Sequence, residues 1–152
     1  MSNLAWQNIL PEIYYIVQVV LAIILGAVIG WQREKIGKAA GARTYALVTA
    51  GSALFTILSI SAFPADPARI AAQIVTGIGF LGAGAILHKE SRIVGLTTAA
   101  GLWIAAAIGM AVGLGYYLLA IVSSLIILAV LMINEKKIAH ASDLQRDEIE
   151  ED

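Results

Sequence analysis

Residues 66–87 read DPARIAAQIVTGIGFLGAGAIL, and this stretch decides how the rest of the chain is interpreted. Asp66 stands where a side chain caps the first free N–H groups of a helix, and Pro67 suits the first helical position. Residues 67–87 would span roughly 31 Å as a helix, which is enough to cross a bilayer. The stretch also carries Arg69, Gln73 and several glycines, which a helix surrounded by lipid does not need. We therefore predict a membrane-spanning helix at the centre of a bundle.

The composition of the whole chain is typical of a membrane protein. Of its 152 residues, 59% are hydrophobic and only 14% are charged, and the mean hydropathy is +0.82. A soluble domain of this size would carry far more charge on its surface. No basic stripe is present, so we expect no nucleic-acid partner. The chain has no cysteine, which excludes disulfides and thiolate metal sites.

Five apolar segments have the length of membrane-spanning helices. They are residues 13–31, 45–63, 67–87, 96–112 and 116–133. The link Gly113-Leu114-Gly115 is so short that one long helix over the last two segments is an alternative, although it would be too long for a single crossing. The predicted fold is all-α, a bundle of five transmembrane helices in a domain of residues 1–134. A polar, acidic tail follows at 135–152. The N-terminus lacks a basic signal-peptide region, so we expect the first segment to be retained.

The basic residues predict the orientation of this bundle. Of the ten Lys and Arg residues, only Arg69 falls on the side opposite to the first loop, the third loop and the tail. Basic residues concentrate in cytoplasmic loops, so we predict the N-terminus outside and the C-terminus in the cytoplasm. Aromatic residues mark membrane interfaces. The expected outer ones are Tyr14, Tyr15, Phe63, Tyr116 and Tyr117, and the expected inner ones are Trp31 and Tyr45.

Small residues recur at helix-packing spacing in three of the segments, and such residues let helix backbones approach closely. The candidates for helix packing are Gly26, Gly30, Gly77, Gly79, Gly82, Gly84, Gly101 and Gly109. They predict a tight set formed by the first, third and fourth helices, with the fifth facing lipid. The order Gly77-x-Gly79-x-x-Gly82 also matches a dinucleotide fingerprint. That motif works only between a strand and a helix, so we interpret it as packing.

Three polar residues gather at the outer end of the central stretch: Asp66, Arg69 and Gln73. Arg69 lies in the first turn of the helix, where the helix dipole disfavours a cation. One interpretation is an Asp66–Arg69 ion pair that reaches the lipid headgroups. The other adds Gln73 and forms a polar recess that faces the interior of the bundle. Because polar residues inside a membrane are functional candidates, we take the three as a candidate functional cluster.

A second set of candidates lies on the inner side. It consists of Arg33, Glu34, Arg43, Thr44, Thr97 and Thr98. Arg43 precedes the second helix, where Glu34 or Glu90 could pair with it, or where an anion could occupy the helix N-terminus. Walker A, HExxH and GxSxG motifs are absent from the sequence. We therefore predict no catalytic residues, no metal site, no cofactor and no enzymatic activity.

Several adjoining motifs resemble the MgtC/SapB family of bacterial inner-membrane proteins, in register over about residues 13–133. They are Gly30-x-Gln-Arg33, Gly41-Ala-Arg43-Thr44, Asp66-Pro-Ala-Arg69 with Gln73, Gly77-Ile-Gly-Phe-Leu-Gly-Ala-Gly84 and Gly95-Leu-Thr-Thr-Ala-Ala-Gly-Leu-Trp103. The resemblance implies a multi-pass protein of the inner (cytoplasmic) membrane, linked to adaptation to low magnesium and, in some relatives, to virulence. It also implies that the protein regulates a membrane partner, such as the F-type ATP synthase.

Two positions depart from the family pattern, Gln32 where an acidic residue is usual and Thr97 where some virulence-type members have Asn. Those members also carry a soluble C-terminal regulatory domain. We expect any partner site of this chain on its helices or short inner loops.

A small transporter or channel for magnesium, phosphate or another ion, built from several copies of the chain, is the alternative function. Magnesium prefers carboxylates and other hard oxygen ligands. The predicted spans contain no Asp or Glu. We therefore favour regulation of a membrane-protein partner over transport, and the sequence leaves open whether the chain also assembles with copies of itself.

Overall fold

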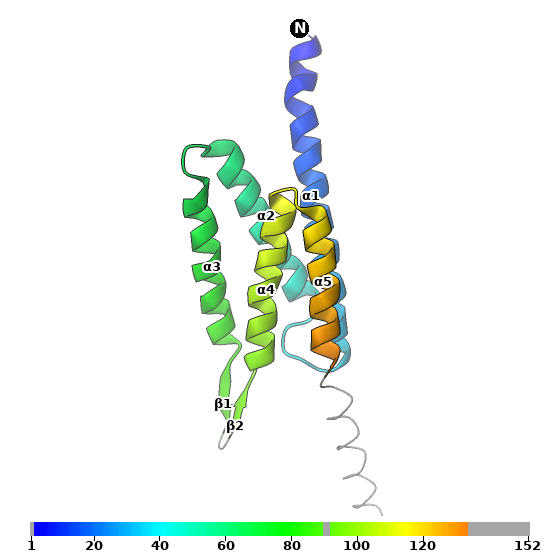
Figure 1. Cartoon of the computed structure of the whole chain (residues 1–152), viewed down its shortest axis with the longest axis vertical. Helices are drawn as coiled ribbons and strands as arrows, with labels where there is room; N and C mark the ends of the chain where they lie inside the picture. Colours follow the sequence, from blue (N-terminus) through cyan, green and yellow to red (C-terminus); the bar gives the residue numbers. More distant parts are fainter. Residues whose placement is uncertain (1, 90–91, 134–152) are drawn as a thin grey trace, which may run out of the picture.

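The structure, a computed structural model, describes residues 2–89 and 92–133, with side chains described for residues 10–86 and 93–133. Five helices run alternately in opposite directions, and a short hairpin joins the third to the fourth (Figure 1). The elements are α1 (Ser2–Lys35), α2 (Ala42–Ala62), α3 (Pro67–Gly84), β1 (Leu87–Lys89), β2 (Arg92–Val94), α4 (Leu96–Gly113) and α5 (Tyr117–Met132). The predicted tail at 135–152 and Glu90 lie outside the described residues.

α1 is longer at both ends than the predicted segment 13–31. Its C-terminal end is determined by Gly37, whose φ of 70° lies in the left-handed region. The N–H of Gly37 donates to the carbonyl of Glu34, and the N–H of Lys38 donates to the carbonyl of Arg33, both at 3.0 Å. These two bonds form a Schellman motif, which satisfies carbonyls left free at a helix end. The helix therefore continues past the apolar segment and stops where the glycine allows the chain to turn.

The predicted end of the third helix at Leu87 is wrong, because α3 ends at Gly84. Leu87 instead begins β1, which pairs antiparallel with β2 so that Leu87 lies opposite Val94. Gly95 follows this hairpin with a φ of 97°, and a Cβ at that position would overlap the backbone carbonyl of Ala85. Only glycine tolerates both conditions. The described chain is thus helical except for this two-stranded hairpin.

The tight link between the last two segments is a turn, and α4 and α5 are separate helices. Gly115 has a φ of 82°. Its N–H donates to the carbonyl of Val112 at 2.9 Å, and the N–H of Tyr116 donates to the carbonyl of Ala111 at 2.8 Å. This is a second Schellman motif, so the alternative of one long helix does not apply.

Three helical segments are long and apolar enough to cross a membrane: Leu10–Lys35 within α1, α2 and α4. α3 contains Arg69, Gln73 and several glycines, which lower its hydropathy, and α5 has only 16 residues. The five predicted helices are confirmed as helices. That all five cross the bilayer, and that the N-terminus lies outside, stay predictions.

α2 and α4 occupy the centre of the bundle. α1 packs chiefly against α2, α3 packs against α4 and α2, and α5 packs against α4 (Figure 1). Of the predicted set of first, third and fourth helices, α4 does contact both α1 and α3, but in the described chain α2 and not α1 lies beside α3. The residues in the middle of this core are buried small and branched apolar side chains, including Ala53, Ala105 and Val112.

Five glycines on two helices approach α2 closely: Gly26, Gly30, Gly101, Gly109 and Gly113. A Cβ on Gly26 would overlap the hydroxyl of Thr49, and one on Gly109 would overlap the backbone carbonyl of the same residue. A Cβ on Gly101 would overlap the hydroxyl of Tyr45. These glycines therefore bring both α1 and α4 against α2, and α1 and α4 also contact each other.

The glycines of α3 have different surroundings. A Cβ added at Gly82 would lie 3.6 Å from the Cβ of Ala99 on α4, which is an ordinary van der Waals contact. Gly77, Gly79 and Gly84 have no heavy atom of the described chain within 4 Å of an added Cβ. The prediction that these three pack against helices of the same chain is wrong, because α3 lies at the edge of the bundle.

A buried polar row, which is absent from the predictions above, runs along α2. Its members are Thr49, Ser52, Thr56 and Ser59, each at most 5% exposed. The hydroxyl of Thr49 donates to the carbonyl of Ala22 on α1 at 2.7 Å, and Ser59 donates to the carbonyl of Pro67 at the start of α3 at 2.7 Å. Spacings of three and four residues within an apolar segment indicate such a row, so the signal was present in the sequence.

Candidate functional site

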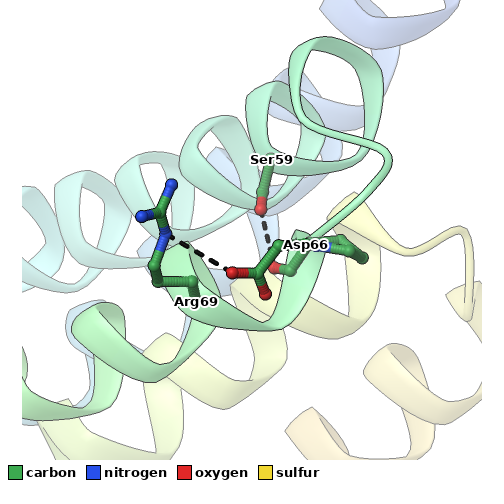
Figure 2. Close-up of polar contacts among 4 residues, drawn as sticks. Ser59, Asp66 and Arg69 are labelled. Carbon is green, nitrogen blue, oxygen red and sulfur yellow. Dashed lines mark hydrogen bonds and ion pairs between the residues drawn. The ribbon is translucent and has the colours of Figure 1, made fainter.

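The N-terminal end of α3 carries an exposed ion pair. The Nε of Arg69 lies 3.5 Å from Oδ2 of Asp66, and Figure 2 shows the two side chains directed toward each other. Their side chains are 72% and 59% exposed. The Asp66 side chain makes no capping hydrogen bond, so the predicted cap is wrong and the carboxylate serves the ion pair instead. Because both side chains are exposed, their charged groups are accessible to a partner. An ion pair this exposed stabilises the fold by only about 0–1 kcal/mol.

Gln73 does not join this pair. It lines a groove of about 620 Å³ between α2 and α3, and Arg69 is not among the residues that line it. The predicted recess of Asp66, Arg69 and Gln73 is therefore not formed. We call this feature the α2–α3 groove. Its boundaries are defined by Arg43, Leu47 and Phe55 on α2 and by Ile70, Gln73 and Leu81 on α3.

The floor of the α2–α3 groove is apolar. Val48 of α2 and Ile74 and Ile78 of α3 belong to a cluster with Ala106 and Met110 of α4. This is the place where three helices meet, and the packing holds the groove in shape. Since α4 closes its back, the groove opens only toward the outside of the bundle.

Two glycines leave space along the wall of the groove. Gly51 on α2 and Gly77 on α3 both line it, and an added Cβ on either one would meet no heavy atom of the described chain within 4 Å. Side chains at these positions would project into the groove. Gly77 therefore keeps the groove open and, contrary to the prediction, does not pack against another helix of the described chain.

The polar end of the groove lies at the start of α2, where Arg43 and Thr44 line it. The predicted pair between Glu34 and Arg43 is not formed in the described chain. Glu34 Oε2 instead accepts a hydrogen bond from the backbone N–H of Ala42 at 3.0 Å. The helix N-terminus, where we expected an external anion, is thus occupied by a carboxylate of α1, and Arg43 remains directed to the groove.

Thr44 connects the groove to a second, smaller hollow of about 370 Å³. Thr98 of α4 and Phe80 of α3 also line this hollow. Thr98 is buried, whereas Thr97 is exposed and lines neither space. Of the predicted inner-side residues, the structure therefore brings together Arg43, Thr44 and Thr98.

Arg33 lies apart from these residues, in the core between α1 and α2. Its side chain is 2% exposed, and it interacts electrostatically with Tyr45, which is 0% exposed. The expected place of Tyr45 at the inner membrane interface is therefore wrong. Burying a charge in a membrane protein is costly, which makes Arg33 a functional candidate with Tyr45 as its neighbour.

These residues can provide an anion-binding side chain next to apolar surface. Within the described ranges, no three His, Asp or Glu side chains come close enough together to hold a metal ion. Arg43 instead supplies a positive charge at the mouth of an apolar groove.

Comparison with known proteins gives consistent matches over most of the chain. Residues 19–139 match the family described as the MgtC family. The YhiD protein of Escherichia coli (strain K12), whose name proposes it as a magnesium transporter, is 49% identical over 126 residues, which cover 77% of this chain and 59% of YhiD. The protein MgtC of Salmonella typhimurium (strain LT2) is 48% identical over 114 residues, which cover 75% of this chain and 49% of MgtC.

A further relative, from Haemophilus influenzae, is 43% identical over 122 residues, which cover 73% of this chain and 51% of that protein. The chain thus spans between about half and three fifths of the length of these curated relatives. No solved structure matches the chain.

Proposed function

The chain belongs to the MgtC family, and from this premise we propose that it regulates another membrane protein when magnesium is scarce. The family match, the name of the relative YhiD and the apolar helices support a membrane protein with a magnesium-linked role. In our proposal the chain is not an enzyme and lies in the bacterial inner membrane as a multi-pass protein. Its N-terminus is outside and its C-terminus is cytoplasmic. The partner in this proposal is a membrane protein such as the F-type ATP synthase.

The position of α3 is the observation that best supports action through a partner. α3 lies at the edge of the bundle and turns a face away from the other described helices. On that helix Phe80 is 80% exposed, and Gly79 has open space beside it. Small residues allow a neighbouring helix to approach closely. The accessible Asp66–Arg69 pair at the outer end adds a polar contact, so α3 offers both parts of a helix-binding surface.

The test is rescue of growth in low magnesium, in a bacterial strain that lacks its own MgtC-family proteins. We expect Arg69→Ala to abolish rescue while the amount of protein in the membrane stays unchanged, because the exposed ion pair adds little to stability. Arg69→Lys keeps the charge and is the matched control, for which we expect partial rescue. Full rescue by a well-expressed Arg69→Ala protein would show that this cluster does not carry the function.

Capture experiments and flux measurements separate the two functions. If the protein regulates the ATP synthase, tagged protein should recover subunits of that enzyme, and Arg69→Ala should recover fewer. The alternative, a small oligomeric transporter or channel, is supported by the name of YhiD. Flux of magnesium, phosphate or protons into liposomes that contain only the purified protein would establish the alternative and overturn our first choice.

A further inference from the structure

The α2–α3 groove has the length of one leaflet of a bilayer. Along α2 its lining runs from Arg43 to Phe55, roughly 18 Å at about 1.5 Å per residue. Along α3 it runs from Ile70 to Leu81, roughly 17 Å. The hydrocarbon core of a bilayer is about 30 Å thick, so one leaflet contributes about 15 Å. A chain that enters beside Arg43 and follows the groove would therefore reach the middle of the membrane.

The chemistry of the groove is that of an amphiphile site. Beyond Arg43 and Thr44 its walls are mainly apolar, and Gln73 lies near the opposite end. Arg43 forms no ion pair within the described part of the chain, because the nearby carboxylate of Glu34 binds the backbone of Ala42. A positive charge followed by an apolar channel is complementary to an anionic headgroup followed by an acyl chain.

The groove is open to lipid along its side. Its rims are exposed, with Leu47, Phe55 and Leu81 at 74%, 56% and 51% exposure, so a chain in the bilayer can enter from the side. A volume of about 620 Å³ leaves room for an extended alkyl chain, and the positive charge of Arg43 at one end favours an anionic amphiphile as the occupant.

We propose that the α2–α3 groove binds one anionic phospholipid, with its phosphate at Arg43 and one acyl chain along Gly51 and Gly77. The lipid would come from the leaflet that faces the basic loop containing Lys38. This binding site is independent of the proposed regulation of a partner, because it rests on the groove and its charge alone. The two glycines are essential to it, since any larger side chain there would occupy the path of the acyl chain.

Native mass spectrometry of the purified chain in detergent tests this proposal. The probes are phosphatidylglycerol and phosphatidylcholine with identical acyl chains, added in equal amounts. We expect the protein to retain one phosphatidylglycerol in preference to phosphatidylcholine. Arg43→Gln should reduce that preference at least about tenfold, the factor expected for the loss of one charge-assisted contact. Lys38→Gln removes the same charge from the same end without touching the groove, and should keep the preference.

A second pair of variants tests the acyl-chain path. Gly77→Leu should abolish retention of both lipids, whereas Gly79→Leu should retain them like the unaltered protein. Both glycines have open space beside them on α3, but only Gly77 lines the groove, so a general effect on folding should be equal in the two variants. Intact secondary structure, measured by circular dichroism, is required of both.

Four results would overturn the proposal. Equal retention of the two lipids would exclude the role of Arg43, and unchanged retention by Gly77→Leu would exclude the groove. Displacement of phosphatidylglycerol by millimolar inorganic phosphate, with no difference between long and short acyl chains, would make the site one for free phosphate. A dimer that Gly77→Leu dissociates, with no bound lipid, would assign the groove to a second copy. Failure of the ATP synthase capture would leave the lipid site unaffected.

Discussion

Gly109→Ala should push α4 away from α2 and lower the free energy of unfolding, by an amount that follows from the contacts of Gly109. A Cβ at this position would overlap the carbonyl oxygen of Thr49 and approach the Cβ of Ser52 to 2.9 Å. Because the overlap is with backbone, whole helices must move, and we take about 3 kcal/mol from the upper part of the range for overpacking. The higher helix propensity of alanine offsets about 1 kcal/mol of this loss. The net loss is about 2 kcal/mol.

Gly77→Ala is the matched control, since Gly77 is also within a helix but has open space beside it. It gains the same helix propensity without overlap and should be stabilised by about 1 kcal/mol. The two variants should therefore differ by about 3 kcal/mol, or about 6–12 °C in melting temperature by the scaling for chains of this size. Thermal unfolding in one detergent, followed by circular dichroism, measures the difference. Equal melting temperatures would refute the close approach of α4 to α2.

Three further variants test individual contacts by the same assay. Thr49→Val keeps the shape of the side chain but loses the bond to the carbonyl of Ala22, and should cost about 0.6 kcal/mol, a drop of about 1–2 °C. Glu34→Ala removes the acceptor for the N–H of Ala42 and should cost about 1 kcal/mol, or about 2–4 °C, while Glu34→Gln, which keeps an acceptor oxygen, should cost less. Arg69→Ala should leave the melting temperature within about 4 °C of the unaltered protein, so that lost rescue in low magnesium reflects function; a larger drop would contradict this.

The polar residues of α2 explain why this helix is central. A helix that is apolar all round gains little from packing inside a membrane, because lipid is as apolar as another helix. Thr49 binds a carbonyl of α1, and Ser59 binds one at the start of α3. Gln18 of α1 adds a bond from its Nε2 to the carbonyl of Val112 on α4 at 2.8 Å. Directional bonds of this kind determine which helices become neighbours.

The number and places of the helices could be predicted from the sequence alone, because burial in a membrane requires apolar residues in continuous runs. The predicted helix ends were less accurate where a glycine with a positive φ determines the end. Gly37 extends and stops α1 through a Schellman motif, and Gly95 allows the hairpin that shortens α3. Family membership was also readable, since several motifs follow one another in register over residues that match the MgtC family.

Only the tertiary structure decided what each small or polar residue contacts. Gly109 and Gly77 are the same residue in the same kind of helix, yet one touches a backbone carbonyl and the other borders an open groove. Arg33 and Arg43 are both basic residues near one loop, yet one is buried and the other lines that groove. Hydropathy depends on local composition and is visible along the chain. Contact depends on which helix lies opposite, and packing between segments distant in sequence determines that.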